Sequence, residues 1–384
     1  MRDVFIIGSK GIPARYGGFE TFVEQLIRYQ KSKEIRYHVA CMGDQAKEFE
    51  YRGCHCFQIK VPDIGPAKAV WYDLAAFWYS LKKIRRQSMK SPIVYALACR
   101  IGPFAGFLGG KLHCMGGRFF VNPDGHEWKR AKWNQAIRKY WKFSEKLMVK
   151  HADLLICDSK NIEAYILNQY KQYRPKTTYI AYGANVGKSR LSDTDGTLLE
   201  WYRKWGLKPK EYFLIVGRFV PENNYETMIR EFMSAKTDKK LAIISNVEEN
   251  PFYRKLEEKT GFSGDSRIVF CQTVYEEQLL KKIRENAFAY LHGHEVGGTN
   301  PSLLEALGST NVNLLLDVGF NREVGEDAAL YWTKRKGSLS SLIQTAEELL
   351  ESEIDVLGSK AKKRILTAYS FEQIAEEYEK QFLG

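Results

Sequence analysis

The sequence has no paired-cysteine motif, no leader-like start and no long apolar run. Its seven cysteines are scattered, without a Cys-x-x-Cys pair, at positions 41, 54, 56, 99, 114, 157 and 271. The run Cys54-His55-Cys56 is too tight to hold zinc alone, because neighbouring side chains of a strand point to opposite faces. Unpaired thiols are typical of proteins in a reducing cytoplasm, so these absences argue against a disulfide scaffold or a zinc module.

Neither a signal peptide nor a bilayer span is expected. Arg2-Asp3 leads directly into an apolar segment, without the basic-then-apolar layout of a secretory leader. The longest weakly polar stretch, residues 101–110, is too short and too rich in glycine to cross a membrane. We therefore expect a protein that is soluble or at most attached to a membrane surface.

The composition is that of a globular chain with two cores. The 384 residues are 44% apolar and 13% aromatic, which excludes disorder and collagen and is enough for two domains. The net charge of +12 is uneven. Residues 1–183 hold 31 basic and 15 acidic residues, whereas residues 184–384 hold 27 and 31. An anionic partner is therefore expected for the first half.

Short apolar runs alternate with helical patterns along the whole chain. The apolar run at 3–8, for example, is followed by Phe19, Phe22, Val23, Leu26 and Ile27 at helical spacing. Further strands are predicted at 36–42, 92–98, 118–122, 153–157, 177–182, 212–217, 240–245, 267–271, 287–292 and 312–317. Such alternation predicts an α/β fold of two doubly wound, Rossmann-like domains with a cleft between them. The polar stretch 187–197 marks the boundary between a domain at 1–186 and one at 187–369, and helix 370–384 is expected to pack back on the first.

Three segments carry candidate chemistry. The run 8–18 follows the first strand and ends in Gly17-Gly18, where a helix start could offer amides to an anion. A plain loop-to-helix connection is the alternative, since the spacing is not Gly-x-Gly-x-x-Gly. In the second half, Gly217-Arg218 follows a buried strand, where an Arg is well placed to hold a phosphate or is simply solvated.

The third segment, 292–307, is the most informative. Gly297-Gly298 leads into Thr299-Asn300-Pro301-Ser302, which opens a helix with polar caps and a proline, suited to a diphosphate. Glu305 would then reach a ribose or, alternatively, face the helix dipole as a first-turn acid. His292 and His294 are interpreted as ordinary strand-end histidines. Asp193-Thr194-Asp195 could hold a metal, but its place in a linker favours solvation.

These residues resemble the retaining glycosyltransferases of family 4, which have the GT-B fold. Gly217-Arg218 and Glu305 match that family, whereas Asn223 stands at its lysine position and Gly297 at its first glutamate. The runs 8–21 and 122–130 are similar to those of a narrower group, the bacterial β-1,4-rhamnosyltransferases. The resemblance implies dTDP-β-L-rhamnose as donor and an undecaprenyl-diphosphate-linked GlcNAc or glucose as acceptor. It also implies retention of anomeric configuration without a required metal or other cofactor.

The resemblance and the strand ends together suggest which residues act. Arg218 and the amides around Gly298, Thr299 and Asn300 would hold the donor diphosphate, with Gly17 and Gly18 closing from the other domain. The remaining donor-site candidates are Glu222, Asn223, Gly297, Ser302 and Glu305. Asp124 is the candidate base or stabiliser. Asp158, which could instead be a helix cap, and Tyr182 follow neighbouring strands. Retention by a covalent carboxylate intermediate or by same-face attack in an ion pair both stay open.

Two basic, aromatic stretches are expected to meet the acceptor and an anionic membrane. Their candidate residues are Trp71, Trp78, Lys82, Lys83, Arg85, Arg86, Lys129, Arg130, Lys132 and Trp133. The alternative is a core-facing apolar stripe with a solvated basic back. The membrane interpretation places the protein in the cytoplasm, peripheral on the inner face of the plasma membrane. The sequence does not indicate an oligomeric state.

Two other functions compete with this interpretation. The first is a transferase of the same fold that uses UDP-glucose or UDP-GlcNAc as its donor. Nucleic-acid binding would also use a basic half. However, the sequence has no helix-turn-helix, OB-like or RNP pattern, and the basic helices are rich in aromatic residues.

Overall fold

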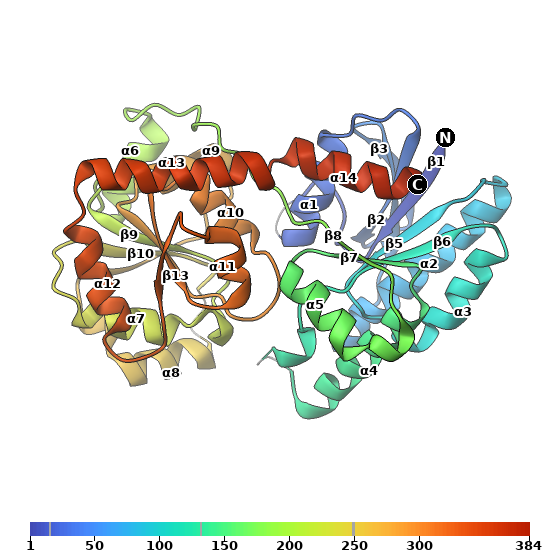
Figure 1. Ribbon diagram of the computed structural model, residues 1–384, viewed down its shortest axis with the longest axis horizontal. Helices are drawn as coiled ribbons and strands as arrows, with labels where there is room; N and C mark the ends of the chain where they lie inside the picture. The colour runs from blue at the N-terminus through green and yellow to red at the C-terminus, as the bar shows by residue number, and fades with distance from the viewer. Residues whose placement is uncertain (15–16, 131–132, 248–249) are drawn as a thin grey trace. The chain divides into compact units, whose positions relative to one another are not determined.

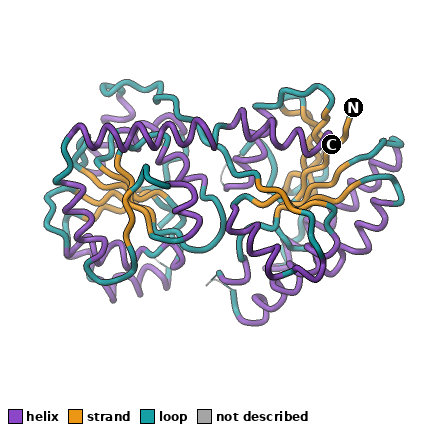
Figure 2. Tube along the Cα trace, viewed as in Figure 1, coloured by secondary structure: helices purple, strands orange, loops and turns teal. Residues whose placement is uncertain are grey.

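The computed structural model describes residues 1–14, 17–130, 133–247 and 250–384. The chain forms two compact units, the first made of Met1–Tyr182 with Phe371–Gly384 and the second of Gly183–Ser370. Each unit has a central sheet with helices on both faces (Figures 1 and 2). The chain thus leaves the first unit after Tyr182 and returns to it at Phe371.

The first unit is built on an eight-stranded sheet in the order β3-β4-β2-β1-β5-β6-β7-β8. All neighbours are parallel except β3 and β4, which are antiparallel. Its strands are β1 (Arg2–Ile7), β2 (Ile35–Gly43), β3 (Lys47–Tyr51), β4 (Cys54–Lys60), β5 (Ile93–Leu97), β6 (Arg118–Asn122), β7 (Leu154–Cys157) and β8 (Thr177–Tyr179). Its α-helices are α1 (Gly18–Arg28), α2 (Lys68–Arg86), α3 (Gly102–His113), α4 (Gln135–His151), α5 (Lys160–Gln169) and α14 (Phe371–Leu383).

Continuous apolar strands form the core of this unit because helices cover both faces of the sheet. Residues 4–7 of β1 and all of β5 are buried. On one face α14 packs against α1, β1 and β2 (Figure 1). Tyr378 and Phe382 of α14 have no exposed surface and contact the rings of Tyr95 and Tyr37. The last helix of the chain therefore completes the core of the first unit.

The second unit has a six-stranded parallel sheet in the order β11-β10-β9-β12-β13-β14. Its strands are β9 (Tyr212–Val216), β10 (Lys240–Ile244), β11 (Ile268–Cys271), β12 (Ala289–His292), β13 (Val312–Leu316) and β14 (Leu330–Trp332). Its α-helices are α6 (Gly196–Trp205), α7 (Tyr225–Ser234), α8 (Pro251–Thr260), α9 (Glu277–Glu285), α10 (Pro301–Leu307), α11 (Gly319–Gly325), α12 (Ser338–Glu347) and α13 (Glu351–Ala368). Separate apolar clusters cover the two faces of the sheet.

Most predicted strands lie within one or two residues of their observed bounds. Three differences stand out. Neither β3 nor β4 was predicted, and three of the five residues of β3 are exposed and charged. Strand 177–182 ends early, at Tyr179. The polar stretch 187–197 includes the start of α6, where the Asp195 carboxylate accepts from the Thr197 and Leu198 amides as a helix cap.

Candidate active site

The loops that follow β9 and β12 lie next to each other, because these strands are paired in the sheet. Arg218 stands at the end of β9 with an exposed side chain. No described residue forms an ion pair or hydrogen bond with its guanidinium. A strand-end arginine without an internal partner is available to an external anion.

Asn223 joins these two loops. Its Nδ2 donates to the Arg218 carbonyl at 2.7 Å, and its Oδ1 lies 2.8 Å from Nδ1 of His294. The neighbouring Asn224 donates to the Gly293 carbonyl at 2.8 Å. At the position where family 4 has a lysine, this chain therefore has an amide that holds the Arg218 backbone in place.

The loop 293–300 does not present the start of α10 in the way the sequence suggested. Asn300 caps the helix, with its Oδ1 accepting from the Ser302 amide at 2.9 Å. Pro301 has no N–H, and the Leu303 amide donates to the Asn300 carbonyl. The amides of Gly298 and Asn300, by contrast, have no acceptor among the described residues. The available donors thus lie in the glycine loop, before the helix begins.

Ser302 was predicted to bind the donor, but its hydroxyl is used inside the protein. Its Oγ donates to the Val216 carbonyl at 3.0 Å and lies 3.1 Å from the Tyr290 hydroxyl. Arg284 of α9 donates to the same oxygen at 3.3 Å. Ser302 therefore ties α10 to the ends of β9 and β12.

Glu305 is oriented by a buried cation that the sequence did not reveal. One Glu305 oxygen lies 2.7 Å from Nη2 of Arg284, whose side chain is 5% exposed while that of Glu305 is 41% exposed. The pair leaves part of the carboxylate open to solvent. Arg284 lies 21 residues earlier on another helix, so no local pattern could have predicted the contact. The first-turn-acid interpretation of Glu305 is wrong, because α10 begins at Pro301 and has no acid in its first turn; the partner of Glu305 is this arginine.

The two histidines and Glu222 complete this region. Burial lowers the pKa of His292 to about 3, so its ring is neutral at physiological pH. Its Nε2 has no hydrogen-bond partner among the described residues.

Gly297 has φ 130, and a Cβ atom added there would lie 3.3 Å from Nε2 of His294. Glu222 is buried, and one of its carboxylate oxygens has no partner among the described residues.

In the first unit, the loop after β1 is held by two glutamates of α1. The amide of Lys10 donates to Glu20 and that of Ala14 donates to Glu24, both at 2.6 Å. Gly17 has φ 129 and leaves no room for a side chain beside Glu20. Gly18 begins α1. The loop is thus fixed by carboxylates, which sequence reasoning missed, and not only by its glycines.

Asp124 lies just beyond β6 in a left-handed conformation with φ 54. Its amide donates to Oδ1 of Asn122 at 2.7 Å, and its carboxylate is 3.7 Å from Nη2 of Arg130. Nδ2 of Asn122 donates to the Tyr182 hydroxyl at 3.4 Å. Burial, followed by the nearby Asp158 and Asp124 carboxylates, raises the pKa of Tyr182 well above its usual value. Asn122, which was not predicted, thus connects two of the predicted residues.

Asp158 is 3% exposed and follows β7. It is not the cap of α5, since Ser159 holds that position and accepts from the Asn161 amide. The helix-cap interpretation of Asp158 is therefore wrong. Its carboxylate lies close enough to Tyr182 to raise the pKa of that phenol.

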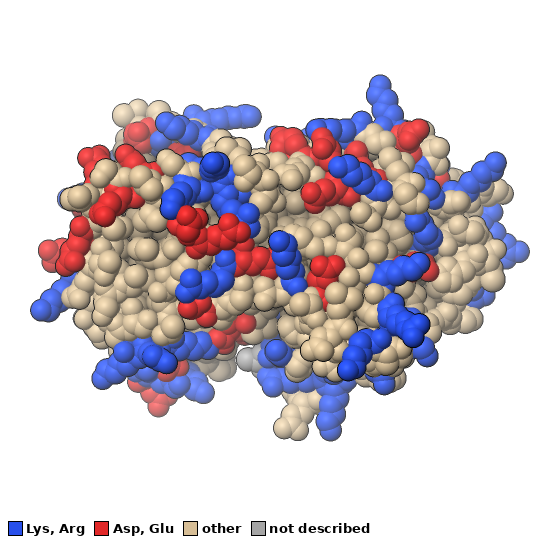
Figure 3. Space-filling view, in the orientation of Figure 1, with Lys and Arg blue, Asp and Glu red and all other residues tan. Residues whose placement is uncertain are grey.

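The predicted acceptor and membrane residues fall into two groups. Trp71, Trp78, Lys82, Arg85, Arg86 and Lys129 are exposed, and Figure 3 shows Lys and Arg side chains with few carboxylates over the α4 side of the first unit. The others are engaged within the unit. Lys83 pairs with Glu48 at 3.0 Å, Arg130 pairs with Glu127, and the Trp133 indole donates to Glu127 at 2.9 Å. Lys132 lies outside the described residues.

Helix α3 adds two exposed aromatic rings that the sequence analysis left out. Phe104 is 45% and Phe107 is 59% exposed. The Phe107 ring contacts Trp78, with centroids 6.0 Å apart, and the Lys111 ammonium lies 4.9 Å from its centroid. The helix α3 has too few polar residues to show an amphipathic pattern in the sequence. Only the structure shows that the Phe107 ring lies against Trp78 of α2.

Comparison with known proteins identifies the fold. Residues 1–185 match a family model described as a domain of unknown function, DUF1972. Sucrose-phosphate synthase from Thermosynechococcus elongatus superposes with a TM-score of 0.78 at 16% identity, over 100% of this chain and 98% of that one. The trehalose-6-phosphate synthase OtsA gives 0.77 at 13% identity, over 100% and 99%. The trehalose-phosphate synthase from Burkholderia xenovorans, solved with glucose-6-phosphate, gives 0.75 at 11% identity, over 100% of both chains.

The chain has the GT-B fold. The fold class predicted from the sequence is thereby confirmed. No curated protein matches the chain by sequence.

Two further findings concern metals and membranes. Among the described residues, no three His, Cys, Asp or Glu side chains are gathered as a metal site. Asp193, part of the Asp-x-Asp run, pairs with Lys282 at 2.9 Å, and Asp195 caps α6, so both carboxylates of the run have structural roles.

In the part of this GT-B chain that is described, no helix combines the length and apolar character needed to cross a bilayer.

Proposed function

We propose that this protein is a retaining glycosyltransferase that transfers a sugar from a nucleotide diphosphate donor. Two observations support this proposal most strongly. The Arg218 guanidinium at the end of β9 is exposed and has no partner among the described residues. In the neighbouring glycine loop, the amides of Gly298 and Asn300 have no acceptor among the described residues. A cation and fixed amide dipoles aimed at a diphosphate stabilise the charge that builds up as the sugar leaves. Thr299 belongs to the same loop.

Glu305 would bind the ribose hydroxyls, with Arg284 fixing its orientation from behind. The ribose hydroxyls would donate charge-assisted hydrogen bonds to the oriented carboxylate, which favours one nucleoside geometry. Glu222, which is buried at the same strand edge, and Asn223, which holds the Arg218 carbonyl, would maintain the shape of the loop. No metal is required in this proposal, because the leaving group is met by protein donors.

For the finer assignment we propose dTDP-β-L-rhamnose as donor and an undecaprenyl-diphosphate-linked GlcNAc or glucose as acceptor, joined by a β-1,4 bond. The runs 8–21 and 122–130, whose resemblance to rhamnosyltransferases was described above, support this choice. Asp124 would be the base or stabiliser at the reacting carbon. Tyr182 is connected to it through Asn122, and the Asp158 carboxylate lies near the Tyr182 phenol. Trehalose-6-phosphate synthase from E. coli has been solved with UDP-2-fluoro glucose, so a UDP-sugar is the nearest alternative donor.

The protein would bind its lipid-linked acceptor at a membrane surface. The residues that would contact this surface are the exposed Trp71, Trp78, Lys82, Arg85, Arg86 and Lys129. Between residues 64 and 118 the chain has nine Lys and Arg and a single acid, Asp73. Asp73 is itself buried against Arg100, at 3.1 Å. Basic side chains beside exposed aromatic rings favour an anionic lipid interface. In this proposal the protein works at the inner face of the plasma membrane.

A transfer assay tests the proposal directly. The purified protein is incubated with dTDP-rhamnose, UDP-glucose or UDP-GlcNAc and a synthetic lipid-diphosphate GlcNAc, and the product linkage is read by NMR. Rhamnose transfer with a β-1,4 bond is the expected outcome. Transfer only from a UDP-sugar would contradict the donor assignment. Binding of nucleic acid without any thermal shift from these donors would refute the enzyme proposal itself.

A further inference from the structure

The carboxyl ends of β1 and β5 mark the point where the sheet of the first unit changes direction. The two strands are paired, and the chain continues from β1 to β2 on one side of them and from β5 to β6 on the other. In open α/β sheets, ligands bind in the crevice outside such a pair of strand ends. No residue of the loop that follows β5 has so far been assigned a role.

Arg100, in the loop after β5, joins these two strand ends. Its Nη1 donates to the Gly8 carbonyl at 2.7 Å and to the Leu97 carbonyl at 3.4 Å, and it lies 3.1 Å from the Asp73 carboxylate. The Asp73 side chain is 3% exposed. Burial raises the pKa of Asp73 to about 6, so its carboxylate is mostly ionised at neutral pH and balances the charge of the guanidinium.

The backbone around Arg100 is also held in place. Ala98 has φ 75, a left-handed conformation that costs energy in a residue with a side chain. The Tyr140 hydroxyl donates to the Arg100 carbonyl at 2.8 Å, and Oγ of Ser144 donates to the Cys99 carbonyl at 2.7 Å. Arg100 is therefore fixed before any ligand binds, which reduces the entropic cost of a contact with it.

Part of the Arg100 guanidinium is available to a ligand. The contacts to Gly8, Leu97 and Asp73 all use Nη1, and no described residue accepts from Nε or Nη2. The side chain is 20% exposed, so these donors reach solvent. An arginine held in this way offers hydrogen-bond donors in a rigid, planar arrangement.

Two carboxylates of the neighbouring loop lie close to these donors. The loop after β6 is next to that of Arg100, because β5 and β6 are paired along their length. Burial lowers the pKa of Arg100, but the nearby Asp73, Asp124 and Glu127 carboxylates raise it above its usual value. Fixed donors and carboxylate acceptors are thus neighbours at this edge of the sheet.

This arrangement favours a neutral, hydroxylated ligand over an anion. The charge of Arg100 is already balanced by Asp73, and a phosphate placed here would be repelled by Asp124 and Glu127. A sugar hydroxyl, by contrast, can accept from the guanidinium through its oxygen and donate its own proton to a carboxylate. Each of these hydrogen bonds includes a charged group and is therefore stronger than a bond between neutral groups.

We propose that Arg100 binds the acceptor sugar beside Asp124, donating from Nε or Nη2 to a hydroxyl next to the one that attacks. This inference rests on the proposed function and deepens it, because it names a residue that selects the acceptor sugar. For a β-1,4 bond the attacking oxygen is O4, so the recognised hydroxyl is the one at C3 or at C6. An acceptor without that hydroxyl leaves the arginine donors unpaired, which is how a polar site rejects an analogue.

A transfer assay with deoxy acceptors tests the proposal on the full chain. Synthetic lipid-diphosphate GlcNAc is compared with its 3-deoxy and 6-deoxy forms, in the wild type and in D73N/R100Q. The double variant removes both members of the pair, so neither charge is left buried alone.

One of the two deoxy acceptors should raise the acceptor KM of the wild type at least ~10-fold, as expected for the loss of a hydrogen bond to a charged group. D73N/R100Q should show a similar rise with the intact acceptor, no further rise when the same hydroxyl is missing, and an unchanged affinity for dTDP. Additive losses would mean that Arg100 contacts another part of the acceptor, such as its diphosphate, and would overturn the sugar assignment.

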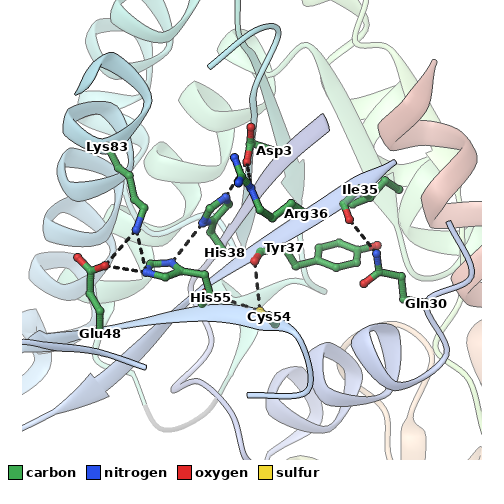
Figure 4. A network of polar contacts seen from close by, with 10 residues as sticks. All are labelled: Asp3, Gln30, Ile35, Arg36, Tyr37, His38, Glu48, Cys54, His55 and Lys83. Atoms are coloured by element: carbon green, nitrogen blue, oxygen red, sulfur yellow. Dashed lines mark hydrogen bonds and ion pairs between the residues drawn. The ribbon is translucent and has the colours of Figure 1, made fainter. Parts of the chain in front are cut away.

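The matched control is D3N/R36Q, which removes another arginine and its buried carboxylate from the same sheet, at the amino ends of the strands. Figure 4 shows this pair, with Arg36 2.6 Å from Asp3 and His38 2.8 Å from the same carboxylate. Urea denaturation measures the stability of both double variants. D3N/R36Q should keep the acceptor KM of the wild type, and an equal rise in both double variants would overturn the role of Arg100.

The failure of this inference can be distinguished from the failure of the proposed function. An active D73N/R100Q enzyme with the acceptor KM of the wild type would refute the role of Arg100 and keep the transferase. If no nucleotide sugar supports transfer, calorimetry with lipid-diphosphate GlcNAc decides. Binding to the wild type that D73N/R100Q loses would keep the sugar site and refute the transferase, whereas equal binding to both would refute the two together.

Discussion

Replacing Arg218 by alanine should separate binding from stability. The guanidinium is exposed and has no partner among the described residues, so its removal should change the free energy of unfolding by no more than about 0.5 kcal/mol. If it contacts a diphosphate, the loss is one charge-assisted contact of about 1.5–3 kcal/mol. That corresponds to a dTDP dissociation constant about 10- to 150-fold higher.

Calorimetry with dTDP and with thymidine measures the effect, and urea denaturation checks the fold. The affinity for thymidine should not change, because it has no phosphate. Arg203→Ala, an exposed arginine of α6 in the same unit, is the matched control and should bind dTDP normally. An Arg218→Ala variant that binds dTDP as tightly as the wild type would refute the placement of the phosphates.

Three further predictions concern titratable side chains in the two units. Asp124→Asn should abolish transfer while dTDP binding persists, because the amide cannot act as a base or stabilise positive charge; retained turnover in the transfer assay would refute its role. Glu305→Gln should weaken dTDP binding and lower stability by about 1–3 kcal/mol in urea, because buried Arg284 loses its carboxylate; an unchanged midpoint would contradict this. Burial lowers the pKa of His292 to about 3, so the unfolded chain takes up the extra proton first as the pH falls, and stability should drop by roughly 2 kcal/mol between pH 7 and 5. His292→Gln should lose that part of the pH dependence, and identical profiles for variant and wild type would count against the assignment.

The sheets were predictable because their signal is local. A strand covered by helices on both faces is apolar throughout, as in β1 and β5, and can be recognised without knowing its neighbours. Strand β3 has no such signal, since its residues are mostly exposed and it is defined by its pairing with β4. The short strand β14 is likewise defined by its neighbour β13.

The candidate site was predictable only as far as its motifs reach along the chain. Arg218 and Glu305 stand in recognisable runs, but the partner of Glu305 is Arg284, on a different helix. Ser302 shows the opposite case, because its position in a helix-start motif suggested a ligand contact that its bonds to Val216 and Tyr290 already use. Which polar groups are left unpaired is a property of the tertiary structure, and that is what selects a site.

The place of α14 has a consequence for how the protein is made. Tyr378 and Phe382 are needed in the core of the first unit, yet they leave the ribosome only after the whole second unit has been synthesised (Figure 1). The unit that is translated first is thus the one that finishes folding last. A fragment of residues 1–182 would expose the rings of Tyr37 and Tyr95, whereas adding a synthetic peptide of residues 371–384 should restore a compact, protease-resistant fold.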